Sequence, residues 1–152
     1  MAVSAKVYTE GVVGQFGGLG DIGFAIAARR VDWLSDTIKV ALMTSSYTPS
    51  QTAHGAYTAD IAPYEVSGTG YTAGGAILGS KTATKSSSVV TLDAADVSWT
   101  TATITARYAA VYKVAGANGY LLGYVDFGTD QTATAGTFTI TWNASGMFTY
   151  TL

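Results

Sequence analysis

Short runs of alternating side chains constrain this chain more than any other sequence feature. In the first clear run, Ile38, Val40 and Leu42 point to one side of an extended chain, and the residues between them point to the other side. Similar strand-like runs continue to the C-terminus. They cover residues 76–80, 88–92, 97–100, 103–114, 120–127, 137–142 and 147–152. The pattern predicts an all-β fold with no clear helix in this part of the chain.

Turn signals separate most of these runs. Asn118-Gly119 precedes the run that begins at Tyr120, and this pair accepts the positive φ angles of a tight hairpin turn, so the runs on either side of it are predicted to be neighbours. Residues 143–146 join the last two runs, which predicts an ordered C-terminal strand. A sandwich, a jelly roll and a barrel all fit this pattern. We expect an antiparallel β-sandwich with jelly-roll-like connectivity.

Glycine marks the beginning of the chain and one long connection. Residues 11–23 contain six glycines, which predicts a glycine-rich N-terminal arm. Residues 22–34 are rich in alanine and fit either a short helix or an extended segment. The predicted organisation is an arm and lead-in segment over residues 1–34 and a β-sandwich domain over residues 35–152. Residues 47–75 contain both prolines and several glycines, leaving little room for a regular element, and long connections of this kind are usually functional surfaces.

The charge balance limits the possible partners. Eight Lys and Arg against ten Asp and Glu give a formal charge of −2, so there is no basic excess for binding the phosphates of nucleic acid. No apolar run is long enough to span a membrane, and the N-terminus lacks the pattern of a signal peptide, so we expect no membrane partner. Charged residues make up only 12% of the chain, and such a neutral surface favours association between copies as a homodimer or homotrimer.

Two segments resemble cofactor or metal motifs but lack the context that those motifs need. Residues 18–23 match G-x-G-x-x-G, yet no apolar strand precedes them and no alternation of strands and helices follows. Residues 126–128 have the letters of the kinase triplet DFG in a chain that is too short for a kinase. We therefore expect no cofactor.

The titratable residues do not assemble into a catalytic constellation in the sequence. Asp93 and Asp96 form one carboxylate pair, Asp126 and Asp130 form another, and each pair flanks a predicted turn where Asp commonly binds its own backbone. His54 is the single histidine and lies in the long connection. We expect a non-enzymatic protein with no metal site and no small-molecule substrate.

Aromatic side chains are the best candidates for contacts with another chain. Trp99 shares its parity with Val97, and Trp142 shares its parity with Ile140, so both tryptophans are predicted to face inward. Tyrosines in the long connection are free of that constraint and could anchor an interface. The predicted interface residues, taken from the arm and the long connection, are Tyr8, Phe16, Leu19, Tyr47, Tyr64 and Tyr71.

Several segments together resemble small structural proteins encoded in the head modules of tailed bacteriophages, the family of head decoration or cement proteins. The resemblance runs from about residue 35 to the C-terminus and does not cover the arm. It is carried by residues 35–42 (SDTIKVAL), 47–49 (YTP), 64–71 (YEVSGTGY), 74–75 (GG), 102–108 (ATITARY) and 121–128 (LLGYVDFG).

The resemblance implies a β-sandwich that binds the outside of an assembled capsid and bridges neighbouring subunits of the major capsid protein. The expected location is the capsid exterior of a virion, after synthesis in the cytoplasm of the bacterial host. Similar proteins are also found as tail or head-fibre components, so that placement stays open. A carbohydrate-binding β-sandwich that uses Tyr64 and Tyr71 as stacking platforms is a further alternative.

Overall fold

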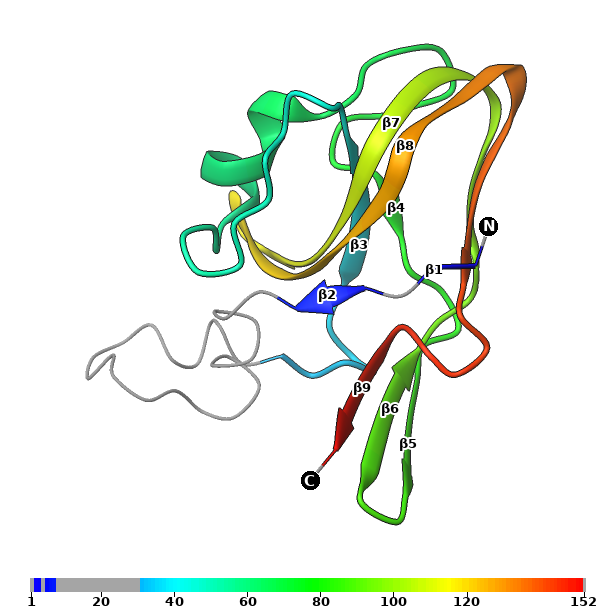
Figure 1. The fold of residues 1–152 in the computed structure, drawn as a ribbon. Helices are drawn as coiled ribbons and strands as arrows, with labels where there is room; N and C mark the ends of the chain where they lie inside the picture. Colours follow the sequence, from blue (N-terminus) through cyan, green and yellow to red (C-terminus); the bar gives the residue numbers. More distant parts are fainter. Residues whose placement is uncertain (1, 4, 8–30, 152) are drawn as a thin grey trace.

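Figure 1 shows the fold in a computed structural model, which describes residues 2–3, 5–7 and 31–151. Over these residues the chain forms a six-stranded sheet in the order β1-β8-β7-β3-β4, with β2 also paired to β8, and a three-stranded sheet in the order β5-β6-β9. The expected all-β sandwich is confirmed. The two longest strands, β7 and β8, are consecutive in sequence and pair with each other.

A long curved hairpin forms the frame of the molecule (Figure 1). It consists of β7 (Val97–Ala115) and β8 (Asn118–Trp142). The prediction that these segments are neighbours is confirmed, but the position of the turn is not. Ala115 pairs with Asn118, so the turn consists of residues 116–117, and Gly116 adopts the positive φ of 57° that a tight turn needs. The asparagine and glycine of the predicted turn begin β8 instead.

Irregularities in pairing let the two long strands bend. The sequence predicts two shorter strands in place of each of them, with breaks near residues 101–102 and 128–136. The structure carries both strands through these breaks as register shifts, with positive φ at Thr101, Gly128 and Ala135. Bulges of this kind increase local twist and bend a strand without ending it. What reads as a turn in the sequence is therefore a corner within a continuous ribbon.

Strand β3 (Ile38–Met43) lies inside the large sheet and is buried on both faces. Its alternating residues enter two separate clusters. We call the first the apolar core, which contains Ile38, Val40, Leu42, Trp33, Val97, Trp99, Ile104, Leu122, Phe127, Phe138, Ile140, Trp142, Met147 and Phe148, among others. We call the second the tyrosine core, which contains Ala41, Met43, Tyr47, Ile61, Ala110, Tyr112, Leu121 and Tyr124. The inward placement predicted for the tryptophans of β7 and β8 is confirmed.

The small sheet contains β5 (Thr82–Ser86), β6 (Val89–Asp93) and β9 (Phe148–Thr151). The predicted C-terminal strand is confirmed as β9, which pairs with β6. The sequence patterns did not identify β5, because its residues do not alternate between apolar and polar. Trp33 fastens this sheet to the rest of the molecule, because its ring packs edge-on against Phe148 and its indole N–H donates to the carbonyl of Asp93 at 3.2 Å.

The remaining strands are short and lie at the borders of the large sheet. β1 (Ala2–Val3) pairs in parallel with the end of β8, β2 (Lys6–Val7) pairs antiparallel with its first part, at Gly123 and Tyr124, and β4 (Ala76–Ile77) pairs with β3. The first two belong to the segment predicted as arm and lead-in. The glycine-rich residues 11–23, and most of the segment predicted as helix or extended, lie outside the described residues. The part of that segment that is described, residues 31–34, forms no helix.

The long connection, which was expected to have little room for a regular element, contains two helical turns. They are η1 (Tyr57–Ile61), a single π-helical turn, and η2 (Ala62–Tyr64), a 3₁₀ turn that has proline in its first residues. Ile61 is fully buried in the tyrosine core and ties η1 to the sheet. Nowhere in the described ranges is a helix long and apolar enough to cross a membrane.

Candidate interaction surface

A glutamate holds the long connection in place. Glu65 accepts hydrogen bonds from the hydroxyl of Tyr57 at 2.6 Å, from the hydroxyl of Tyr71, and from the backbone N–H of Gly74 at 2.7 Å. The Tyr71 hydroxyl also accepts a bond from the backbone N–H of Leu42 in β3, at 3.0 Å. One carboxylate thus joins the middle of the connection to its C-terminal end and, through Tyr71, to the sheet.

The tyrosines around Glu65 are hydrogen-bond donors at neutral pH. Burial, followed by the hydrogen bond and charge of Glu65, raises the pKa of Tyr57 and of Tyr71 above the ordinary value for tyrosine. Burial, with a smaller effect of the same carboxylate, raises the pKa of Tyr112 to about 12. A group that holds its proton this firmly is a poor general base, so the network fits a structural clamp better than an acid–base centre.

The clamp continues to the tip of the β7–β8 hairpin. Tyr57 stacks on Tyr112 with ring centroids 4.4 Å apart, and the Tyr112 hydroxyl donates to the carbonyl of Gly74 at 2.8 Å. Thr58 donates to the carbonyl of Ala117 in the hairpin turn, at 2.8 Å. The connection is therefore attached to β3 and to the hairpin tip.

A second aromatic group lies on the other side of the connection, around Tyr47. The rings of His54, Tyr64 and Tyr108 lie 5.5, 5.5 and 5.8 Å from the Tyr47 ring. The Tyr47 hydroxyl and Nδ1 of His54 are 2.9 Å apart and share a hydrogen bond. Tyr47 itself is only 1% exposed, whereas Tyr64 is 39% exposed. The buried ring thus supports an exposed one.

An ion pair next to this group positions a cation at the surface. The Arg107 guanidinium lies over the Tyr108 ring, 5.3 Å from its centroid, and its Nε donates to Asp126 at 2.8 Å. The hydrogen bond with Asp126 raises the pKa of Arg107, and the same bond lowers the pKa of Asp126. We call the surface formed by Tyr64, Tyr108, Arg107 and Asp126 the Tyr64 surface.

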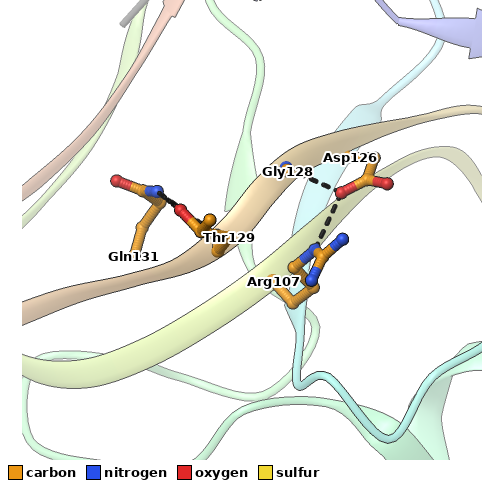
Figure 2. Close-up of polar contacts among 5 residues, drawn as sticks. All are labelled: Arg107, Asp126, Gly128, Thr129 and Gln131. Atoms are coloured by element: carbon orange, nitrogen blue, oxygen red, sulfur yellow. Dashed lines mark hydrogen bonds and ion pairs between the residues drawn. The ribbon is translucent and has the colours of Figure 1, made fainter.

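The β8 corner presents Asp126 to the arginine. Figure 2 shows that Asp126 accepts from Arg107 and also from the backbone N–H of Gly128, at 2.8 Å in each case. Gly128 has a φ of 81°, which glycine adopts without strain. Just beyond it, the side-chain amide of Gln131 donates to the carbonyl and hydroxyl oxygens of Thr129, at 3.2 and 3.0 Å. The corner is closed by its own polar groups, so the carboxylate is held in one place.

The structure places the predicted interface residues in different environments. Tyr64 is the exposed one. Tyr47 is buried, so the expectation that its ring faces another chain is corrected. Tyr71 is half-buried, with its ring tilted against Trp99 and its hydroxyl on Glu65, so it holds the connection. The other three predicted residues, Tyr8, Phe16 and Leu19, lie outside the described residues.

Sequence reasoning missed Glu65, Arg107 and Tyr108. A glutamate among glycines and tyrosines carries no motif, and its partners come from positions up to nine residues away. The adjacent Arg107-Tyr108 pair, in a strand whose other outward residues are mostly threonine and serine, was the available signal.

Two of the four carboxylates discounted as catalytic are hydrogen-bonded to backbone groups, whereas Oδ1 of Asp93 is buried without a hydrogen-bond partner among the described residues. Asp96 accepts from the backbone N–H of Trp142 at 2.9 Å, and Asp126 accepts from that of Gly128. Asp60, a residue of η1, accepts from the N–H groups of Gly55 and Ala56 at 2.8 Å each. Over residues 31–151 and the short N-terminal strands, no three His, Cys, Asp or Glu side chains gather closely enough to hold a metal ion.

Comparison with known proteins gives no relative for this chain. No protein-family model matches it, and no significant match was found among curated proteins or solved structures. Its function must therefore be inferred from its own residues and their geometry.

Proposed function

We propose that this chain is a non-catalytic structural protein of a tailed bacteriophage particle. It binds the outer surface of the assembled capsid and bridges neighbouring subunits of the major capsid protein. The observation that carries a docking role is the Tyr64 surface, where an exposed tyrosine of η2 rests against Tyr47 and an arginine of β7 is held by an ion pair. Tyrosine and arginine are among the residues most enriched at the energetic centres of protein interfaces.

Preorganisation supports docking at this surface. The backbone carbonyl of Tyr64 accepts from the backbone N–H of Thr44 at 3.0 Å, and its ring rests against Tyr47. Arg107 is fixed by Asp126, which is itself fixed by Gly128. A side chain that is already ordered loses little conformational entropy on binding, and that loss is one of the main costs of association.

The virion assignment rests on the resemblance of residues 35–152 to head decoration proteins and on the nearly neutral composition. A small rigid module that touches two or more capsid subunits makes each further contact intramolecular, so modest contacts suffice. The predicted arm would add contacts of this kind. Its residues Tyr8, Phe16 and Leu19 remain predicted interface residues.

Binding to separated phage parts tests this proposal. The labelled chain is mixed with DNA-free heads and, separately, with tails from the phage that encodes it, and bound protein is measured after sedimentation through a gradient. Saturable binding to heads, in a fixed ratio to the capsid subunit, is the expected result. Binding to tails alone would move the protein to the tail or head-fibre class, and binding to neither would overturn the virion assignment.

A pair of variants tests the surface itself. Tyr64→Ser removes the exposed ring, and we expect it to weaken head binding by about tenfold or more. Ile77→Ser is the matched control, because Ile77 is 65% exposed and lies on β4, outside the Tyr64 surface. If both variants bound heads as tightly as the unchanged chain, the Tyr64 surface would not be the docking site.

The carbohydrate-binding alternative is weakened by the position of Tyr71. A stacking platform needs exposed ring faces, and the Tyr71 ring is tilted against Trp99 with centroids 5.9 Å apart. Its hydroxyl is also committed to Glu65 and Leu42. Tyr64 and Tyr71 therefore do not form one platform.

A further inference from the structure

The small sheet ends in an edge strand whose outer backbone edge pairs with no other strand among the described residues. β5 (Thr82–Ser86) is the outer strand in the order β5-β6-β9, and all of its residues are exposed. Its hairpin with β6 extends away from the large sheet (Figure 1). One row of its backbone groups pairs with β6, and within the described residues no hydrogen bond joins the strand to any other element.

Other strand edges are shorter or partly covered. β4 has only two residues, and β8 takes β1 and β2 along its outer side. Just before β9, the carbonyl of Met147 accepts a hydrogen bond from the N–H of Ala5, at 3.4 Å. β5 has no proline, no bulge and one charge, at Lys85. A regular, nearly neutral edge can pair with a strand of another chain. Proteins usually prevent such pairing by placing proline, a bulge or several charges on the edge strand.

We propose that β5 pairs with β5 of a second copy of this chain, antiparallel, about a two-fold axis at Thr84. This register places Thr84 opposite Thr84 of the partner subunit and Thr82 opposite Ser86 of the partner subunit. Such pairs of small hydroxyl residues are favourable across strands. Lys85 lies opposite Ala83 of the partner subunit, so no like charges face each other directly.

Neighbouring registers are less favourable. An axis at Lys85 would place the two ammonium groups directly opposite each other, and an axis at Ala83 would place Lys85 opposite Lys81 of the partner subunit. Like charges directly opposed across strands are destabilising. The pairing at Thr84 also continues a row of threonines, because Thr84 pairs with Thr91, and Thr91 pairs with Thr149. The result is a continuous six-stranded sheet across two copies.

The size of the contact sets its strength. Pairing over a five-residue strand buries much less than the ~1,200 Å² of a stable interface, so we expect a dissociation constant of roughly 0.1–1 mM. Copies held side by side on any larger assembly would pair more completely, because the contact then becomes intramolecular. The proposed β5 pairing does not depend on capsid binding. A result that overturns the pairing would therefore leave the capsid-binding proposal intact, and the reverse also holds.

The symmetry of the pair allows a test by charge swap. Thr84→Lys places two like charges at the axis, and so does Thr84→Glu, so each variant alone is expected to dimerise about tenfold or more weakly. An equimolar mixture of the two variants places opposite charges at the axis and is expected to form a heterodimer. The matched control is Thr149→Lys, which adds the same charge in the same row at the opposite edge of the sheet.

Sedimentation equilibrium up to about 1 mM protein, where such a weak contact becomes populated, measures dimerisation. Denaturant unfolding of each variant shows that it is folded. We expect dimerisation by the unchanged chain and by Thr149→Lys, its loss in each single Thr84 variant, and its return in the mixture. A monomeric unchanged chain, a dimer that persists in Thr84→Lys, or a mixture that stays monomeric would each overturn the proposed pairing.

Discussion

The apolar core and the tyrosine core lie on opposite faces of β3 and are built by different chemistry. Ile38, Val40 and Leu42 contribute to the apolar core, where they pack against tryptophan and phenylalanine rings. Ala41, which lies between Val40 and Leu42, and Met43, which follows Leu42, contribute to the tyrosine core, where the packing rings carry hydroxyl groups. A single alternating strand therefore joins a hydrocarbon interior to a hydrogen-bonded one.

The difference assigns a role to each side. Burial of hydrocarbon is non-directional and scales with area, so the apolar core supplies most of the stability. Hydroxyl groups need partners at fixed positions, so the tyrosine core fixes the conformation of the long connection and with it the Tyr64 surface. Substitutions in the apolar core should lower the free energy of unfolding, and substitutions in the tyrosine core should loosen the long connection.

The largest expected effect comes from the apolar core. Ile38 is fully buried there, and Ile38→Ala should lower the free energy of unfolding by about 2–5 kcal/mol, through lost burial and the cavity left behind. Denaturant titration measures it. Ile77→Ala at the exposed edge strand is the control and should change stability by less than about 0.5 kcal/mol. Equal losses in the two variants would contradict the assignment of stability to this core.

A smaller effect is expected from the clamp of the tyrosine core. Glu65→Ala removes the acceptor for Tyr57, Tyr71 and the N–H of Gly74, and should cost about 1–3 kcal/mol. Glu65→Gln keeps one acceptor oxygen and should cost less. Hydrogen exchange should show faster exchange at Gly74 in the Ala variant, with β7 and β8 unchanged. Uniformly faster exchange throughout the chain would mean that the clamp acts on global stability instead.

Alkaline pH should loosen the tyrosine core selectively. A tyrosine with a raised pKa in the folded state stabilises the fold fully below about pH 10, its pKa in the unfolded chain. That contribution is lost as the pH rises through the folded value, which is about 12 for Tyr112. We expect the absorbance of tyrosinate to show that Tyr57, Tyr71 and Tyr112 lose their protons only above the ordinary range for tyrosine. Titration of all tyrosines in one step near pH 10 would contradict this clamp.

The apolar core was largely predictable from the sequence because it depends on periodicity. Alternation alone placed Ile38, Val40 and Leu42 on one face and both Trp99 and Trp142 inside. The continuous ribbon could not be predicted, because glycine at residue 128 reads as a turn whether the strand ends there or bends through a bulge. Pairing between distant residues decides between these outcomes, and it leaves no local signal.

The tyrosine core and the Tyr64 surface were only partly predictable. The density of tyrosine in residues 47–75 indicated an interface, and Tyr64 is exposed as that reading expects. Which tyrosines face inward depends on how the whole connection closes over the sheet, and that closure leaves no local signal in the sequence. Tyr47 was therefore assigned to the surface although it is the buried support of Tyr64.

The smallest change in stability is expected at the ion pair of the Tyr64 surface, which belongs to neither core. Arg107 and Asp126 remain 28% and 36% exposed as side chains, and exposed ion pairs contribute little to folding. Asp126→Asn keeps an oxygen for the N–H of Gly128 but removes the charge that fixes the guanidinium. We expect its denaturation curve to overlay that of the unchanged chain, while head binding weakens because Arg107 must be ordered on docking.

The matched control for this variant is Thr149→Lys, which raises the net charge by one, as Asp126→Asn does, but on β9, away from the Tyr64 surface and from the pairing edge of β5. It should leave both denaturation and head binding unchanged. If Asp126→Asn instead destabilised the fold as much as Glu65→Ala, the β8 corner would act as part of the tyrosine core. Asp126 would then both stabilise the fold and present the Tyr64 surface. Its role could not be separated from that of the residues that hold the connection.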